Sequence, residues 1–377
     1  MSDLSALNFR AHLARVIDLM NSSDDVVQHN IDVLHVRELS GVRWLTGFSG
    51  SNAFVLLDRS SECAHLFTDS RYEEVTKQNI AKAGASVTVH VPGSVKEQEE
   101  MIRQIVGDRT LGINPSAVTV AQSQQLSAIC VVAPASDFIS QARCAKSEAE
   151  IERIAKAAAI ADRALQYVLE RGLVGHSEQR VQAELDYQMA LHGADDSSFR
   201  TIVASGPNGA IPHHRASNRV IQNGDMVVID MGALVDGYHS DMTRSVSIGE
   251  PSDELKQMFE ITAMAQQVAL DHVKDGASTE QIDEAARIIF REAGKEQLFV
   301  HGLGHGVGLD IHEEPYLSRR PGRSLQVGEV VTIEPGLYRV GVGGVRIEDL
   351  VVVTKDGYRN LTHTPKDLLC LPSAPTT

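Results

Sequence analysis

An internal repeat in the second part of the chain restricts its fold more than any other feature. The strand segment NGDMVVIDMG at 223–232 matches VGEVVTIEPG at 327–336 with an offset of 104 residues. Two expected helices precede each segment, and their starts are offset by 105 and 101 residues. These starts are Ser147, Ser177, Ser252 and Ser278. Three similar offsets favour a duplicated helix–helix–strand unit over a chance likeness of two apolar strands, and they predict an α+β domain.

Local signals support two of these helix starts. Ser147 with Glu150, and Ser278 with Gln281, have the residue types and spacing of a capping box, in which the two residues satisfy each other's free backbone N–H groups. A sheet covered by two such helix pairs would place equivalent residues of the two copies near a pseudo-two-fold axis.

The first part of the chain alternates between expected strands and helices. Helices are predicted at 7–21, 70–83 and 95–105, the second of them ended by Gly84, and a strand is predicted at 86–91. Further strands are expected in IDVLHVREL, GFSGSNAFVLLD, AHLFTD and TLGIN. This alternation predicts a three-layer α/β domain. We expect it to occupy 1–140, followed by the repeat domain at 147–377.

Bulk composition narrows the possible functions. The formal net charge of −15 argues against nucleic acid or an anionic membrane as the partner. The sequence contains no apolar run of about 18 residues, so we expect no membrane span. The N-terminus lacks the apolar segment of a signal peptide. The four cysteines are scattered without CxxC spacing, as expected for reduced thiols in a cytoplasmic protein.

The strand of the first copy runs directly into a carboxylate, Asp230, and a second one, Asp241, follows a turn. A solvated surface hairpin is the simple alternative, but an unpaired buried carboxylate would need compensation. The Asp236-Gly237 turn sets a register in which Gly232 lies opposite Asp241 and Asp230 shares their face. The Cβ atoms of the two acids would then be roughly 7–8 Å apart. We expect a gap at Gly232 that holds a cation between them.

The second copy supplies two more acids, Glu334 and Glu348. Pro335 has no N–H to donate to a strand ladder, so a bulge is expected there and the register stays open. The glycine-rich segment HGLGHGVGLDIHEEP adds candidate nitrogen ligands, and glycines let the backbone approach a site closely. Its histidines are His301, His305 and His312.

Four carboxylates with one or two imidazoles form a hard, oxygen-rich ligand set. Such a set suits two divalent ions about 3.5–4 Å apart, which activate a water and polarise a carbonyl. Mn²⁺, Co²⁺ or Fe²⁺ fits this set better than a structural zinc, which prefers thiolates or several imidazoles. We expect Mn²⁺ first, with Co²⁺, Fe²⁺ or Zn²⁺ as alternatives. The chemistry that this set implies is hydrolysis.

Five segments together resemble the pita-bread metallopeptidases, the family of aminopeptidase P, prolidase and methionine aminopeptidase. They are SGPNGAIPHHR, DMGALVDGYHSDMTR, HGLGHGVGLDIHEEP, TIEPGLY and VRIEDLVVVT, which match in order and spacing. WLTGFSGSNAFVLL and FTDSRY resemble the smaller creatinase-like N-terminal domain of the proline-specific members. The resemblance implies that this α/β domain occupies 1–140 and that the pita-bread catalytic domain occupies 147–377.

The resemblance also implies a metal-ligand set. Asp241 and Glu348 would bridge two ions, Asp230 would complete one of them, and His305 with Glu334 would complete the other. Glu334 would also take the proton of the attacking water.

Other polar residues receive roles from the same resemblance. His213 and His312 resemble the two histidines that hold the substrate and the tetrahedral intermediate. Arg346, two residues before Glu348, would orient an acid ligand or bind substrate. His301 is expected either beside the ligands or in a structural role. His214 and His239 stand next to matched positions, where we expect wall residues at most.

The function implied is an Xaa-Pro aminopeptidase, which releases the residue before proline. A strict Xaa-Pro dipeptidase is the alternative, with Arg215 or Arg346 available to capture the free carboxylate after proline. A creatinase-like hydrolase and a binding module on an inactive peptidase fold are more remote, because the acid set is complete. We expect proline-containing peptides as substrates, no nucleic-acid or membrane partner, and a cytoplasmic homodimer.

Overall fold

The computed structural model describes residues 4–83 and 86–372. The described chain forms two compact units, one from Ser5 to Arg143 and the other from Cys144 onward together with Leu4. No described helix combines the length and apolar character needed to cross a membrane.

The N-terminal unit is built on a mixed sheet with the order β4-β3-β2-β1-β5-β6. Its strands are β1 (Ile31–Val36), β2 (Ala53–Asp58), β3 (Cys63–Thr68), β4 (Val87–His90), β5 (Thr110–Ile113) and β6 (Val131–Pro134). Its helices are α1 (Phe9–Asn21), α2 (Asp24–His29), α3 (Leu39–Thr46), α4 (Glu73–Ala83), α5 (Val95–Val106), α6 (Val120–Ser127) and α7 (Phe138–Arg143). The sequence reasoning missed α2, α3, α6, α7 and β6, which are short. The expected helix end at Gly84 lies outside the described residues.

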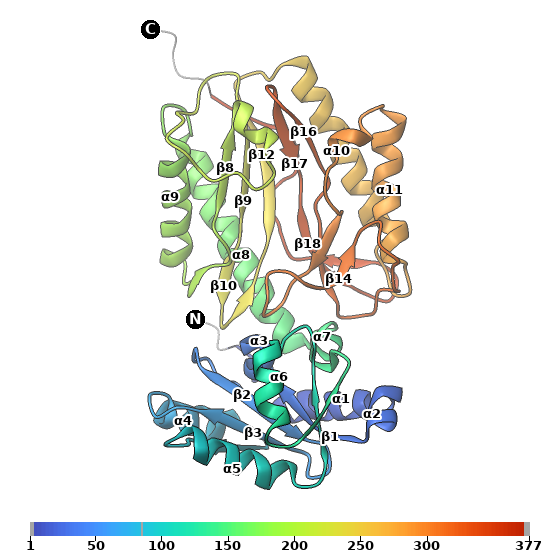
Figure 1. Ribbon diagram of the computed structural model, residues 1–377. Coiled ribbons are helices and arrows are strands. Elements are labelled where there is room, and N and C mark those ends of the chain that lie inside the picture. Colours follow the sequence, from blue (N-terminus) through green and yellow to red (C-terminus); the bar gives the residue numbers. More distant parts are fainter. Residues whose placement is uncertain (1–3, 84–85, 373–377) are drawn as a thin grey trace. The chain divides into compact units, whose positions relative to one another are not determined.

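Helices cover both faces of this sheet, as the three-layer prediction requires (Figure 1). Ile102 of α5 and Leu126 of α6 pack in one apolar core with Val33 of β1. Val36 points to the opposite face because side chains alternate along a strand, and there it lies beside Gly41 of α3.

The second unit begins with the helices that the repeat predicted. They are α8 (Glu148–Arg171), α9 (Glu178–Leu191), α10 (Asp253–Asp271) and α11 (Thr279–Glu292). Ser147 and Glu150 form the expected capping box, with the Ser147 N–H donating to the Glu150 side chain over 2.8 Å. Ser278 accepts from the Gln281 N–H. The predicted helix starts are therefore confirmed.

The strands of this unit lie between the helix pairs α8/α9 and α10/α11 (Figure 1). The first copy contains β7 (Asp196–Ser197), β8 (Ile202–Ser205), β9 (Met226–Met231), β10 (Ala233–Val235), β11 (Tyr238–His239) and β12 (Met242–Ile248). The second contains β13 (Gly304–Gly306), β14 (Glu313–Leu317), β15 (Val330–Ile333), β16 (Gly336–Arg339), β17 (Gly343–Arg346), β18 (Asp349–Val353) and β19 (Tyr358–Asn360). The last strand, β20 (Leu369–Leu371), returns to pair with β12. Each copy has its own apolar core beneath its helix pair.

In the first copy, β9 and β12 pair antiparallel with Asp230 opposite Thr243. The short ladder between β10 and β11 continues the same register. Gly232 therefore lies opposite Asp241, as the turn signal predicted.

In the second copy, the β15–β18 and β16–β17 ladders also share one register. This register places Glu334 opposite Glu348. The prediction of a bulge at Pro335 is wrong. Proline interrupts the strand because it lacks an N–H, but its carbonyl accepts from the Ile347 N–H over 3.3 Å, so no extra residue is inserted.

The two copies meet where β12 passes the start of β18. The Glu348 N–H donates to the Thr243 carbonyl over 3.1 Å, and the Thr243 hydroxyl donates to the Glu348 carboxylate over 2.7 Å. The next residue of each strand forms an ion pair, Arg244–Asp349, at 2.8 Å. These contacts bring the acids of the two copies to one place.

Candidate metal centre and active site

A cavity of about 870 Å³ opens in the second unit. All the metal-ligand and catalytic residues predicted from the sequence line it. They are His213, Asp230, Asp241, His305, His312, Glu334, Arg346 and Glu348. The fold thus collects residues that are up to 135 positions apart, from His213 to Glu348, around one space.

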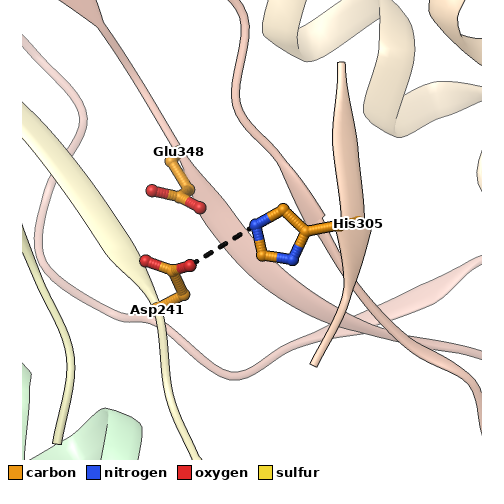
Figure 2. Close-up of side chains that lie close together, drawn as sticks. All are labelled: Asp241, His305 and Glu348. Atoms are coloured by element: carbon orange, nitrogen blue, oxygen red, sulfur yellow. Dashed lines mark ion pairs between the residues drawn. The ribbon is translucent and has the colours of Figure 1, made fainter. Parts of the chain in front are cut away.

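Three of these residues form the centre of the cluster (Figure 2). Asp241 precedes β12, His305 lies in β13 and Glu348 precedes β18. Each offers one ligand atom, and these atoms lie within 4.8 Å of one another. The Nε2 of His305 is 3.6 Å from the Oδ2 of Asp241. All three side chains are buried.

Glu334 and Asp230 lie beside this centre. The Oε1 of Glu334 is 3.3 Å from the Nε2 of His305. The Oδ2 of Asp230 accepts from the Nη2 of Arg346 over 2.5 Å. The five predicted ligands therefore surround one region, with Arg346 as their neighbouring cation.

The prediction of a gap at Gly232 is wrong. A Cβ at this position would clash with the Ser240 carbonyl, so the neighbouring backbone fills the space. Glycine is needed here to let two backbone segments come close, and the cavity lies elsewhere on the face shared by Asp230 and Asp241.

Electrostatics within the cluster are unfavourable without a cation. Burial raises the pKa of Asp241 and of Glu348 well above the ordinary range, and the neighbouring carboxylates raise both further. Burial also raises the pKa of Asp230. Glu334 differs: burial favours its neutral form, but the hydrogen bond and charge of His305 outweigh burial and lower its pKa to about 2.

Two buried oxygens in the cluster have no hydrogen-bond partner within the described part of the chain. They are the Oδ1 of Asp230 and the Oε1 of Glu348. A buried carboxylate oxygen without a partner is costly, and a divalent ion would compensate it. The donor set of four carboxylates and one imidazole is also the type that such ions prefer. The residues therefore fit a metal centre.

His213 and His312 lie on the cavity wall with exposed side chains. The ring of His312 stands edge-on to that of His305, with the centroids 4.4 Å apart. His214 also lines the cavity, but its Nε2 is bound to the carboxylate of Glu178 at 2.8 Å. His214 is therefore part of a buried hydrogen-bond network as well as a wall residue.

Arg346 is held by several acceptors. Besides Asp230, its guanidinium donates to the Tyr338 hydroxyl over 2.9 Å and to the Thr243 hydroxyl over 3.0 Å. The Tyr338 hydroxyl also lies 2.9 Å from the Nε2 of His301. Burial raises the pKa of Tyr338 to about 12, so its hydroxyl stays protonated at neutral pH. His301 is thus linked to Arg346 through the Tyr338 hydroxyl and lies next to the ligands.

The structure also identifies participants that sequence reasoning missed. Thr243 could have been found, because it lies two strand residues beyond Asp241 and so shares its face. Glu178 could not, because a glutamate in a first helical turn is ordinary. His239 was named as a wall residue, but it is not among the residues that line the cavity, and it bonds to Ser198 at 2.9 Å.

Comparison with known families matches both parts of the chain. Residues 152–355 match metallopeptidase family M24, and residues 14–145 match the creatinase/prolidase N-terminal domain. The expected architecture of a creatinase-like domain followed by a pita-bread catalytic domain is confirmed.

Similar proteins extend over nearly the whole chain. An Xaa-Pro dipeptidase of Pyrococcus horikoshii is 35% identical over 362 residues, which cover 94% of this chain and 100% of that protein. The solved structure of an Xaa-Pro dipeptidase from Bacillus anthracis has a TM-score of 0.89 and 34% identity, covering 97% of this chain and 100% of that chain. An X-Pro aminopeptidase structure from Thermotoga maritima has a TM-score of 0.82 and 34% identity, covering 92% of this chain and 100% of that chain.

Proposed function

The chain belongs to metallopeptidase family M24 and is a metal-dependent peptidase, and we propose that it hydrolyses Xaa-Pro dipeptides, the reaction of a prolidase. Our first expectation was an Xaa-Pro aminopeptidase. The alternative that we named, a dipeptidase, is better supported, because Xaa-Pro dipeptidases match over nearly the full length of both chains. The similar X-Pro aminopeptidase structure has a lower TM-score.

The observation that carries this proposal is the charge distribution of the cavity. Its buried lining contains the carboxylates of Asp241 and Glu348, whereas its exposed lining contains Arg215 and Arg320. A dipeptide is a zwitterion whose ammonium and carboxylate are close together. Cations at the rim would complement the carboxylate end, whereas a longer peptide would carry an uncharged amide past the rim.

Arg346 is a poorer candidate for the free carboxylate than we expected. Its guanidinium is buried and already donates to Asp230, Tyr338 and Thr243. No hydrogen bond or ion pair joins the side chain of Arg215 or Arg320 to another described residue. The same holds for Arg200, which is also exposed and lines the cavity, so we assign carboxylate recognition to these three arginines.

The metal centre is part of the same proposal. Asp230, Asp241, His305, Glu334 and Glu348 would hold the metal, and Asp241 and Glu348 are proposed to be shared by two ions. Two divalent ions, Mn²⁺ in the first place, would supply an activated water and a polarised carbonyl when bound.

The remaining steps belong to the chain's own side chains. His213 and His312 hold the substrate carbonyl and donate to the developing oxyanion. Glu334 takes the proton of the attacking water at its carboxylate and delivers it to the proline nitrogen as the C–N bond breaks. Arg346 holds Asp230 in place. Free Xaa and free proline are the products.

Proline specificity is inferred from the relatives rather than from the cavity. The Xaa-Pro amide has no N–H, so peptidases that read an extended backbone through its N–H groups reject it. A creatinase-like hydrolase and a non-enzymatic binding module remain less favoured, because the full acid set surrounds one cavity. A homodimer in the cytoplasm completes the proposal, and sedimentation of the purified protein would test the dimer.

A cleavage assay distinguishes these possibilities. Leu-Pro, Leu-Pro-Ala and Leu-Ala are each incubated with the protein and Mn²⁺, with and without a chelator. We expect rapid cleavage of Leu-Pro, little cleavage of the other two, and loss of activity with the chelator. Faster release of leucine from Leu-Pro-Ala would instead establish an aminopeptidase. Comparable rates on Leu-Pro and Leu-Ala would refute the proline specificity, and activity that survives complete metal removal would refute the mechanism.

A further inference from the structure

The two histidines assigned to the substrate have no hydrogen bonds of their own to hold them. His213 and His312 are exposed, and neither imidazole has a hydrogen-bond partner among the residues that the structure describes. Their direction therefore depends on the backbone that carries them. In both cases the next residue in the chain contacts a buried charged side chain, Glu178 or Lys146.

Beside His213, this contact is made by Glu178 at the start of α9. Its side chain is fully buried, and six hydrogen bonds converge on its carboxylate. Oε1 accepts from the N–H and hydroxyl of Ser205 and from Asn208, and Oε2 accepts from His214 and from the N–H and hydroxyl of Ser217. One carboxylate thus holds both ends of the loop between Ser205 and Ser217.

The other side of His213 is held as well. The Pro212 carbonyl accepts from the Nη1 of Arg346 over 3.3 Å. His213 is therefore bracketed: the residue before it is tied to Arg346, and the residue after it, His214, is tied to Glu178 at 2.8 Å.

Beside His312, the contact is made by Lys146. Its Nζ lies 2.7 Å from the Oε1 of Glu313, and the exposed fractions of the two side chains are only 1% and 9%. The Oε2 of Glu313 accepts from the Asp310 N–H over 3.3 Å, which closes the turn that carries His312. The Lys146 backbone is itself fixed to Gly328, whose carbonyl accepts from the Lys146 N–H over 2.8 Å.

We propose that the contacts Glu178–His214 and Lys146–Glu313 are positioning pairs, which aim His213 and His312 at the reacting carbonyl. The proposal rests on the substrate roles given to these two histidines above. Buried polar contacts add little net stability compared with apolar packing, and the role that we assign to these two is to hold one geometry. An error of about 1 Å in a catalytic group can lower the rate about 100-fold, so such geometry matters at these positions.

Double-mutant cycles test the proposal. The single variants are Glu178→Gln, Lys146→Gln, His213→Ala and His312→Ala. Both Gln variants should lower kcat by about 10- to 100-fold and leave metal content unchanged. Each His→Ala variant should lower kcat by about 10²- to 10³-fold. Once the histidine is absent its positioning pair has nothing to aim, so Glu178→Gln/His213→Ala should be no slower than His213→Ala alone. Lys146→Gln/His312→Ala should likewise match His312→Ala.

The crossed combinations are the matched control. Glu178→Gln/His312→Ala and Lys146→Gln/His213→Ala should show the product of the two single losses, because each pair acts on its own histidine. Glu170→Gln provides a remote control. The exposed Glu170 side chain accepts from Gln166 over 2.9 Å on α8, does not line the cavity, and should keep wild-type kcat when changed.

The outcomes separate this inference from the function on which it rests. The positioning roles are overturned if the kcat losses multiply when a contact and its own histidine are changed together. They are also overturned if the crossed combinations show the same coupling as these matched double variants. Wild-type kcat in His213→Ala or His312→Ala overturns the substrate assignment itself, and the single variants reveal it. If a Gln variant does not fold, His214→Asn and Glu313→Gln repeat the cycles from the other partner of each pair.

Discussion

The two copies of the repeat share a backbone and differ in the charges placed on it. Asp230 pairs with Thr243 in the first copy, and Glu334 pairs with Glu348 at the equivalent place in the second. The position of Asp230 and Glu334 is acidic in both copies. The position opposite it carries a neutral hydroxyl in the first copy and a carboxylate in the second. Thr243 and Glu348 also touch each other where the copies meet, so the difference lies at the pseudo-two-fold axis.

A second pair of equivalent positions differs even more. The register places Gly232 opposite Asp241 in the first copy and Gly336 opposite Arg346 in the second. A carboxylate therefore corresponds to a guanidinium. If both positions were acidic, the cavity would gain a buried negative charge and lose the cation that holds Asp230. Duplication supplies the positions, and divergence between the copies sets the charge balance of the site.

Each copy also uses its second helix to anchor an active-site segment. In the first copy, Glu178 on α9 holds the loop that carries His213. In the second, Asp283 on α11 accepts from the Leu303 N–H over 3.0 Å, and its partner Arg287 donates to the His301 carbonyl over 2.6 Å. The anchors occupy different helical positions, so the copies reached similar support through different residues.

Removal of a proposed bridging acid should have the largest effect on metal content and activity. Asp241 and Glu348 come from different copies but share the proposed bridging role, so Asp241→Ala and Glu348→Ala should each lose both ions and all measurable activity. Asp230→Ala should lose mainly one ion. Metal analysis after gel filtration measures this, and two ions retained in Asp241→Ala would show that it is not a bridge.

The histidines should divide into one that binds metal and two that bind substrate. His305→Ala should lose metal, because its Nε2 faces the acid cluster. His213→Ala and His312→Ala should retain metal and lose about 10²–10³ in kcat, the usual size for an oxyanion-stabilising group. Metal content and kcat are measured on the same samples. Equal metal loss in all three variants would contradict the separate roles.

Thr243 and Glu348, which touch at the pseudo-two-fold axis, form the axis pair. Substitution of Thr243 tests whether its neutral hydroxyl matters. Thr243→Val removes the hydroxyl that donates to Glu348 over 2.7 Å and keeps a similar shape. Loss of such a supporting hydrogen bond should weaken metal affinity or activity by about 10- to 100-fold. Titration with Mn²⁺ gives the affinity, and Thr243→Ser, which keeps the hydroxyl, should stay near wild type. Unchanged affinity and activity in Thr243→Val would show that only the acidic member of the axis pair matters.

The smallest effect concerns the pH dependence of stability. Burial raises the pKa of Glu178, but its hydrogen bonds outweigh this and lower the pKa to about 2 from an ordinary 4.5. The folded state therefore binds this proton less readily than the unfolded state. The stabilisation is fully present above about pH 4.5 and declines as the pH falls toward 2.

Thermal unfolding of the wild type and Glu178→Gln measures this effect. The difference in Tm should be constant above about pH 5 and shrink at pH 4 and pH 3. A difference that is the same at pH 3 and pH 7 would show that Glu178 does not titrate as its hydrogen bonds imply.

Much of the fold is predictable because its signals are local. The capping boxes, the apolar periodicity and the repeat offset are sufficient to locate α8 to α11 from the amino-acid sequence. The Asp236-Gly237 turn correctly placed Gly232 opposite Asp241, since a two-residue turn determines the register of its hairpin. The short helices of the N-terminal unit were missed because six to eight residues carry too little periodicity to be recognised.

The repeat, the set of acids and histidines, and the register of the first hairpin could all be predicted from the amino-acid sequence, because each is carried by residue types and spacings within short segments. Tertiary structure decided three other features. It placed Glu334 opposite Glu348 without a bulge, filled the space at Gly232 with the Ser240 backbone, and bound His214 to Glu178. Each of these depends on contacts between segments that are distant in sequence or on the path of the backbone in three dimensions. Residue type and spacing along one segment do not specify which distant group will occupy the space beside it.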